Sequence, residues 1–172
     1  MVSSSDRTKR DDRIIVMKKK KIKLCFAASS GGHYEQILML KPLMEKYDSF
    51  LLTEKTKYKA EVGDVKMYYL HQVNRKELLF PFAMLGNSFR SLWLFLKERP
   101  DCVITTGVLA MIPMCLLAKM FRRKLIYIES FAKVHSANQT GKFLYKFADR
   151  FYVQWPQMLE IYPEAICLGG IY

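Results

Sequence analysis

The chain has 172 residues, of which 51% are apolar and 26% are charged. This length is enough for one domain of ordinary size, and the composition is typical of a protein with a hydrophobic core. Together they exclude a disordered polyelectrolyte, a collagen-like chain and a disulfide-stapled miniprotein. Its 28 basic residues outnumber the 16 acidic ones, so the net charge is +12.

The excess positive charge is concentrated at the start of the chain. Residues 1–23 hold nine basic and three acidic side chains and therefore carry half of the net charge. We interpret residues 1–21 as a basic, disordered leader and residues 22–172 as one folded domain. The leader ends in the basic cluster Lys18, Lys19, Lys20 and Lys21. Such a cluster fits the anionic surface of a membrane, and a solvated tail is the alternative.

The cysteines and the apolar runs predict where the protein works. Four cysteines stand far apart among apolar neighbours, without a CxxC pair, and there are only three histidines. This pattern favours reduced core thiols in the cytosol, with no metal site and no cofactor. The longest apolar run, 108–118, has eleven residues, whereas about 20 are needed to span a bilayer. We therefore predict peripheral attachment at the cytoplasmic face of the membrane, without a transmembrane helix.

From residue 22 onward the sequence alternates between strand-like apolar runs and helical periodicity. The runs predict strands over 22–28, 50–53, 66–73, 101–105, 124–129 and 150–154. The periodic segments predict helices over 34–47, 80–97, 109–121, 140–148 and 156–162. Short apolar strands separated by helices indicate a parallel sheet covered on both faces, which is a Rossmann-like α/β fold.

Ligands of such a sheet bind beyond the carboxyl ends of its strands. The first strand is followed by Ser30, Gly31, Gly32 and His33, at the start of a helix. Paired glycines allow a close approach to the backbone, and free N–H groups at a helix start attract phosphate. His33 is able to donate to such a phosphate or to act as a base. A tight turn with a capping or solvated histidine is the alternative interpretation.

Two further strand ends carry polar residues. Thr105, Thr106 and Gly107 follow one strand, and they suit either helix capping or the wall of a ligand cleft. Glu129 and Ser130 follow another. A carboxylate that emerges from an apolar strand is costly to bury unless it faces a site or a partner. Because all three strand ends converge on one rim of the sheet, we interpret them as one site.

The helix over 80–97 is apolar on both of its faces. One face is predicted to be core, and its members are Phe82, Leu85, Phe89, Leu92, Trp93 and Leu96. The opposite face carries Met84, Leu94 and Phe95 among polar residues. Since a surface helix rarely shows this much apolar area to water, we expect this second face either to be covered by the fold or to meet a membrane or partner.

Three segments carry a resemblance to a known family: 28–33, 100–107 and 125–130. They resemble the membrane-associating subunits of two-component glycosyltransferases. The bacterial members of that family serve capsule and exopolysaccharide synthesis. Its eukaryotic members recruit the catalytic subunit that adds the second N-acetylglucosamine to a dolichol-linked acceptor. The family corresponds to the N-terminal half of a GT-B glycosyltransferase.

The resemblance implies a division of labour. This chain would bind the membrane and a polyprenyl-diphosphate-linked acceptor, and a separate catalytic chain would supply the site for the UDP-sugar. The loop 30–33 would meet the acceptor diphosphate, residues 105–107 and Ser130 would line the cleft, and His33 and Glu129 become candidate general bases. The final segment would dock on the partner; it comprises Leu168, Gly169, Gly170, Ile171 and Tyr172.

The residues also bear on two other functions, nucleotide binding and nucleic-acid binding. Glu54 stands about twenty residues beyond the glycine loop, where a dinucleotide-binding fold keeps its ribose-binding acid, so a self-sufficient nucleotide-binding enzyme is the alternative. The missing third glycine of that motif weakens it. Nucleic acid is not an expected partner, because the basic residues form no one-sided stripe interleaved with aromatic residues.

Overall fold

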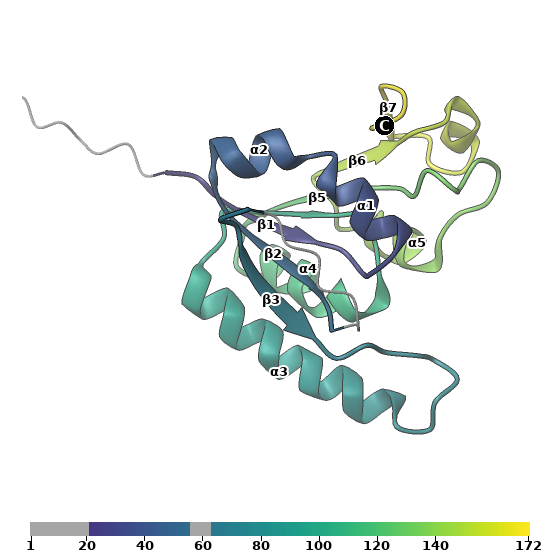
Figure 1. The fold of residues 1–172 in the computed structure, drawn as a ribbon. Coiled ribbons are helices and arrows are strands. Elements are labelled where there is room, and N and C mark those ends of the chain that lie inside the picture. The colour runs from purple at the N-terminus through teal and green to yellow at the C-terminus, as the bar shows by residue number, and fades with distance from the viewer. Residues whose placement is uncertain (1–20, 56–62) are drawn as a thin grey trace, which may run out of the picture.

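A computed structural model describes residues 21–55 and 63–172 and shows a parallel sheet of seven strands in the order β3-β2-β1-β4-β5-β6-β7 (Figure 1). The strands are β1 (Lys23–Ala27), β2 (Asp48–Glu54), β3 (Lys66–Leu70), β4 (Cys102–Thr105), β5 (Lys124–Ile128), β6 (Arg150–Val153) and β7 (Ile166–Cys167). The first six confirm the predicted strands; β7 was not predicted. The chain starts at β1 in the middle of the sheet and adds β2 and β3 on one side. It then returns to add β4 to β7 on the other side, so the strand order reverses between β1 and β4.

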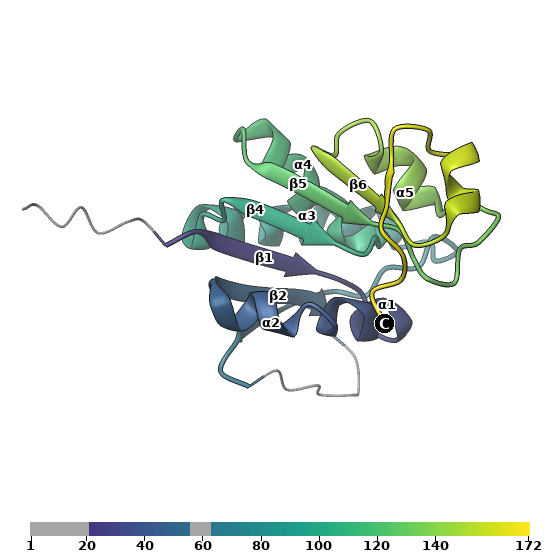
Figure 2. The ribbon, with the colours of Figure 1, turned by 90° about the horizontal axis from the view of Figure 1, so that it is seen from above.

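Helices lie on both faces of the sheet, as Figures 1 and 2 show. They are α1 (Gly32–Leu38), α2 (Lys41–Lys46), α3 (Phe80–Glu98), α4 (Ile112–Met120) and α5 (Gln139–Leu144), with the 3₁₀ turns η1 (Leu109–Met111) and η2 (Pro156–Glu160). Alternate residues of a strand serve opposite faces: Cys25 and Ala27 pack on the α3 and α4 side, Leu24 and Phe26 on the α1 and α2 side. The predicted Rossmann-like fold is therefore confirmed.

The single helix predicted over 34–47 is wrong, because α1 and α2 are separate helices. Pro42 lies in the first turn of α2. Proline has no N–H to donate to the preceding turn and its ring clashes with the carbonyl four residues earlier, so a continuous helix cannot pass through it. The break leaves α1 with only seven residues.

Of the two alternatives for the face of α3 that carries Met84, Leu94 and Phe95, cover by the fold is confirmed. Leu94 and Phe95 are 0% and 3% exposed and Met84 is half-buried, so the alternative that these residues meet a membrane is wrong. The polar residues Asn87, Ser91 and Glu98 are buried beside them. Partners explain two of these: Asn87 exchanges two hydrogen bonds with the backbone of His71, at 2.8 and 2.9 Å. Glu98 accepts from the Lys23 ammonium at 2.8 Å and from the Tyr68 hydroxyl.

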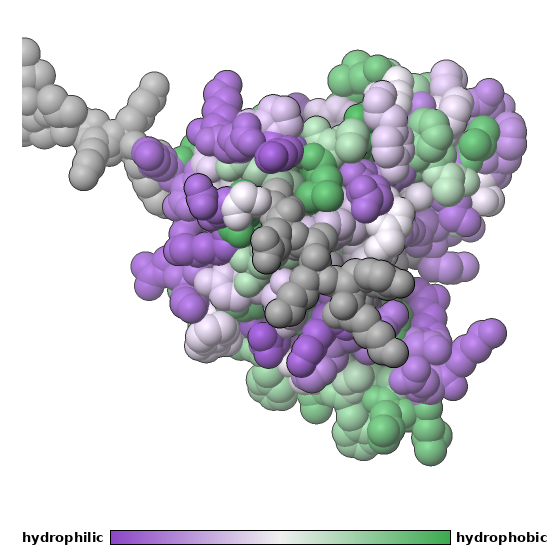
Figure 3. All heavy atoms as spheres, in the orientation of Figure 1, coloured by the Kyte–Doolittle hydropathy of each residue, from purple (hydrophilic) through white to green (hydrophobic). Residues whose placement is uncertain are grey.

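Most of the face predicted as core instead points to solvent. Its exposed members are Phe82 (72%), Leu85 (56%), Phe89 (66%), Trp93 (56%) and Leu96 (52%), which we call the apolar outer face of α3. Leu78 and Leu79, just before the helix, are exposed as well. Figure 3 shows apolar side chains gathered over this part of the molecule. Neighbouring exposed apolar side chains of this kind are typical of surfaces that meet a membrane or another protein.

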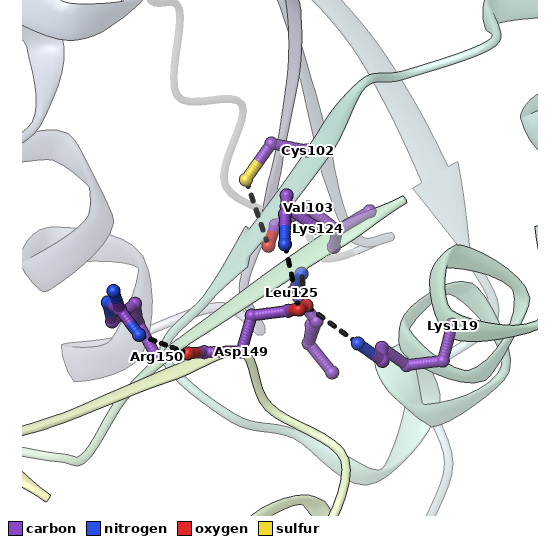
Figure 4. A network of polar contacts seen from close by, with 7 residues as sticks. All are labelled: Cys102, Val103, Lys119, Lys124, Leu125, Asp149 and Arg150. Atoms are coloured by element: carbon purple, nitrogen blue, oxygen red, sulfur yellow. Dashed lines mark hydrogen bonds and ion pairs between the residues drawn. The ribbon is translucent and has the colours of Figure 1, made fainter. Parts of the chain in front are cut away.

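Asp149 ties the amino ends of β5 and β6 to α4 (Figure 4). Its carboxylate accepts from Lys119 Nζ at 2.8 Å, from the Leu125 amide at 2.8 Å and from Lys124 Nζ at 3.3 Å. Burial opposes ionisation, but these three donors outweigh it and lower the pKa of Asp149 to about 2. The charged form of Asp149 therefore stabilises the folded chain.

This network predicts a pH dependence of stability. The unfolded chain ionises Asp149 with a pKa of about 3.9, so its contribution, on the order of 1–2 kcal/mol, is present above that pH and is lost as the pH falls toward about 2. We expect Asp149→Asn to lower the free energy of unfolding at neutral pH, and the difference from wild type to shrink between those pH values. Urea denaturation at a series of pH values measures this. A constant difference would show that Asp149 does not titrate as described.

Candidate functional site

The polar strand ends after β1 and β4 meet at the point where the strand order reverses, which is where ligands bind open α/β sheets. The Thr106 hydroxyl donates to the His33 backbone oxygen at 3.0 Å and so joins the two loops. Gly31 precedes α1 with a φ of +78°, a left-handed conformation that favours glycine. Gly31 and Gly32 are exposed, and a Cβ at either would meet no other atom. Their backbone is open to a ligand.

His33 is half-buried at this junction, and its Nδ1 has no hydrogen-bond partner among the described residues. Burial lowers the pKa of His33; the Thr106 backbone opposes this effect, and the nearby positive charge of Lys133 adds to it. The imidazole is therefore neutral at physiological pH. A neutral histidine is able to accept a proton or donate one hydrogen bond to a bound group.

Lys133 is a site residue that the sequence reasoning missed. It belongs to the loop that follows β5, where its amide donates to the Ser130 carbonyl at 2.9 Å. Its positive charge lowers the pKa of His33 and counteracts the rise in the pKa of Glu129, so it lies within electrostatic reach of both. No motif singles out this lysine in the sequence, because its nearness to His33 depends on the path of the loop.

Glu129 is buried, with 1% of its surface exposed, and its carboxylate is fully engaged. The Ser130 amide donates to it at 2.9 Å, the Tyr162 hydroxyl at 3.0 Å and the Asn138 amide at 3.4 Å. Burial raises the pKa of Glu129, although these donors oppose the rise. In this arrangement the carboxylate fixes both ends of the loop 130–138, which carries Lys133.

Two glycines allow this cluster to close. A Cβ on Gly141 would overlap the Glu129 carboxylate, and a Cβ on Gly107 would overlap the Tyr127 hydroxyl. Gly107 also has a φ of +83°, and its amide donates to the Thr105 hydroxyl at 3.1 Å. The Tyr127 hydroxyl is buried, with no hydrogen-bond partner among the described residues. Thr105, Thr106 and Gly107 are all buried, so they support the strand-end loop from inside the fold and are not exposed to solvent.

Ser30 directly precedes Gly31 at this junction, whereas Glu54 and the lysines of the leader belong to other parts of the chain. Glu54 ends β2 and is buried; burial raises the pKa of its carboxyl, which accepts from the Val73 amide at 3.4 Å. Lys21 is exposed at the start of the described chain, and Lys18, Lys19 and Lys20 lie outside the described residues. Ser30 is half-buried at the rim.

The final segment, 168–172, borders a groove of about 390 Å³ on the α1 and α2 side of the sheet. The groove floor is the part of β4–β6 that includes Ile104, Ile126 and Ile128. The segment is held at two points: the Ile171 amide donates to Gln154 Oε1 at 3.0 Å, and Tyr172 packs edge-on against Phe131, with ring centroids 5.1 Å apart.

Leu168 is 81% exposed beside this groove. Gln154 also donates through Nε2 to the Glu129 carbonyl at 2.9 Å, so one side chain links the segment to the cleft loop.

Residues 21–55 and 63–172 hold no group of three or more His, Cys, Asp or Glu side chains placed to bind a metal ion. None of the helices in these ranges combines the length and hydropathy that spanning a bilayer requires.

Solved structures with the same fold are GT-B proteins. MurG of Acinetobacter baumannii superposes with a TM-score of 0.65 at 18% identity, over 79% of this chain and 42% of that protein. A UDP-N-acetylglucosamine 2-epimerase from Rickettsia bellii gives a TM-score of 0.65 at 13% identity, over 88% and 45%. The chain therefore spans less than half of these proteins, and the likeness shows the fold alone.

Sequence comparison identifies the family. The mouse UDP-N-acetylglucosamine transferase subunit ALG14 is 26% identical over 186 residues, covering 91% of this chain and 86% of the mouse protein. The subunit of the same name from Yarrowia lipolytica is 29% identical over 168 residues, covering 83% and 78%. The profile of the family described as oligosaccharide biosynthesis protein Alg14 like matches residues 46–171, most of the chain. The chain therefore belongs to the Alg14 family.

Proposed function

We propose that this chain is the acceptor- and membrane-binding subunit of a heteromeric glycosyltransferase that uses a UDP-sugar. The curated relatives are named as subunits of a UDP-N-acetylglucosamine transferase, which supports this sugar as the donor. The chain spans less than half of the GT-B proteins that it resembles, so a catalytic companion is proposed to supply the remaining half and most of the UDP-sugar site.

The acceptor is proposed to be a polyprenyl-diphosphate-linked oligosaccharide, bound at the junction of β1 and β4. The observation that carries this proposal is the Thr106–His33 hydrogen bond, which brings the exposed backbone of Gly31 and Gly32 to the end of β4, with the charge of Lys133 near enough to lower the pKa of His33. A diphosphate needs cationic and N–H donors, and this cleft offers both. The helix α1 is short, so the lysine is expected to supply most of the attraction.

His33 and Glu129 take different roles in this proposal. His33, which is half-buried at the junction, is the candidate for proton transfer or for a hydrogen bond to the diphosphate. Glu129 is buried with its carboxylate engaged, so we assign it the role of holding the loop that carries Lys133. A setting in capsule or exopolysaccharide synthesis is proposed from the three motifs that resemble bacterial members of this type.

Attachment to the membrane is proposed to use the apolar outer face of α3, with Lys21 and the preceding lysines adding attraction to anionic lipid. Docking of the companion is proposed at the groove bordered by segment 168–172, whose floor is formed by apolar side chains of the sheet.

Substitution of Lys133 tests the acceptor site. We expect Lys133→Ala to weaken binding of farnesyl diphosphate to the purified chain by about 10- to 100-fold, because a charge-assisted hydrogen bond contributes about 1.5–3 kcal/mol. Lys142→Ala, which removes an exposed lysine on the nearby helix α5, is the matched control and should bind as wild type does. Isothermal titration calorimetry makes the measurement. Equal binding by Lys133→Ala and wild type would contradict the proposed site.

The same titration addresses the alternative of a self-sufficient nucleotide-binding enzyme. The subunit proposal expects the isolated chain to bind farnesyl diphosphate and to bind UDP-N-acetylglucosamine weakly. Tight binding of the sugar nucleotide by the chain alone, lost on Glu54→Gln, would favour the alternative.

A further inference from the structure

A second pocket lies where the carboxyl ends of α3 and α4 come together, near the amino ends of β4 and β5. Its volume is about 300 Å³, and it is lined by Phe95, Leu96, Arg99, Phe121 and Arg123. The rings of Phe95 and Phe121 pack together with centroids 5.0 Å apart and form an apolar wall. The pocket therefore combines two guanidinium groups with an apolar surface.

The charges of this pocket are unequal. Arg123 pairs with Asp101 at 3.0 Å and is largely neutralised. Arg99 forms no ion pair with a described residue; its Nε donates to the Leu96 carbonyl in its own helix turn at 3.3 Å. The pocket thus keeps one cation without an acidic partner in the described part of the chain. A cation of this kind suits a phosphate group.

The pocket is continuous with the apolar outer face of α3. Leu96 belongs to both and is 52% exposed. Met120 and Phe121, at the end of α4, add further exposed apolar surface on this side, at 67% and 42%. A molecule that fills the pocket with its charged end is therefore able to extend an apolar chain along the surface of α3.

We propose that this pocket binds the phosphate headgroup of an anionic phospholipid, while its acyl chains lie against the apolar outer face of α3. Arg99 holds the phosphate, and Phe95, Leu96 and Phe121 contact the glycerol and the start of the acyl chains. The proposal rests on the proposed attachment to the membrane and adds a specific lipid class to it.

The backbone conformation at two helix ends allows arginine to be replaced by glycine without strain. Arg99 and Arg122 directly follow α3 and α4, and both have positive φ, at 49° and 54°. Glycine adopts this conformation without steric strain, so Arg99→Gly and Arg122→Gly should both fold at least as stably as wild type. Of these two arginines, Arg99 lines the pocket and Arg122 does not. Each variant removes one arginine from a helix end, which makes Arg122→Gly the matched control.

The experiment is sedimentation of the full chain with vesicles of phosphatidylcholine alone and with vesicles in which about one lipid in four is phosphatidylglycerol. Loss of any one surface cation should weaken binding to the anionic vesicles by about five-fold. We expect Arg122→Gly to show this modest loss and Arg99→Gly to lose substantially more, although the lysines that precede β1 keep its binding above the level of neutral vesicles. Binding to phosphatidylcholine alone should be the same for all three proteins.

A soluble lipid separates the pocket from general surface charge. Dihexanoyl phosphatidylglycerol below its micelle concentration should raise the melting temperature of wild type and Arg122→Gly but not of Arg99→Gly, and free phosphate should raise none. Equal losses in both variants, or an equal response to free phosphate, would overturn the headgroup pocket. If wild type bound no vesicles and instead formed dimers, the proposed membrane attachment itself would fail.

Discussion

Replacing two aromatic side chains of the apolar outer face of α3, Phe89→Ser together with Trp93→Ser, is expected to abolish binding to phospholipid vesicles. Both residues are more than half exposed, so they are free to enter lipid. Burial of one large apolar side chain contributes about 1.5–3 kcal/mol, and the loss of two should reduce partitioning by about two to four orders of magnitude. Sedimentation with vesicles measures the change.

The matched control removes two exposed aromatic residues elsewhere. Phe143 in α5 and Phe147 just after it are 44% and 37% exposed and pack together, with ring centroids 5.4 Å apart. The double variant Phe143→Ser and Phe147→Ser should bind vesicles as wild type does. The α3 variant should remain folded, because its side chains are outside the core and serine lowers helix propensity only by about 0.5 kcal/mol per residue. Equal vesicle binding by the two double variants would contradict attachment through α3.

Gly107→Ala is expected to be the most destabilising single substitution in the cleft. An L-residue at a φ of +83° costs about 1–2 kcal/mol. The added Cβ also overlaps the Tyr127 hydroxyl, which costs about 1–3 kcal/mol more. Chemical denaturation followed by circular dichroism measures the free energy of unfolding. A loss below about 1 kcal/mol would show that the loop relaxes to accept the methyl group.

A double-mutant cycle separates the two causes. Tyr127→Phe removes the hydroxyl that the new Cβ would strike, and the free energy of unfolding of this single variant is the reference for the cycle. In the Tyr127→Phe background, Gly107→Ala should cost only the part due to its positive φ. Additive losses would show that Gly107 and Tyr127 do not act on each other.

The first six strands were predictable because a parallel sheet covered on both faces needs strands that are short apolar runs. The strand-end motifs could be placed because each directly follows such a run. The split between α1 and α2 was also readable in principle, since Pro42 stands inside the predicted helix. The short strand β7 was not, because two residues give no periodic pattern.

The orientation of α3 was misjudged for a physical reason. Its two faces are similarly apolar, so periodicity alone cannot tell which one meets the sheet. The deciding residues are Asn87 and Glu98, which read as solvent-facing in the sequence but are buried because His71, Lys23 and Tyr68 supply partners. These partners are distant in the chain, and the sequence does not reveal them.

For the site, the sequence placed Ser30–His33, Thr105–Gly107 and Glu129 at strand ends, and the structure brings the first two sets together through Thr106 and His33. It did not indicate Lys133 or Gly141. Their positions depend on the path of the loop 130–138, which Glu129 and Tyr162 set by contacts between residues 33 apart in the chain.

The buried hydrogen bonds of Asn87 and Glu98 hold α3 on the sheet independently of its outer face. Asn87 and Glu98 secure the helix to the sheet by bonds that hydrocarbon does not replace, and Leu94 and Phe95 fill the space between them. Insertion into a bilayer therefore draws on none of the side chains that keep the helix in place. Under the proposed attachment, the domain would therefore enter the headgroup region and leave it again without refolding.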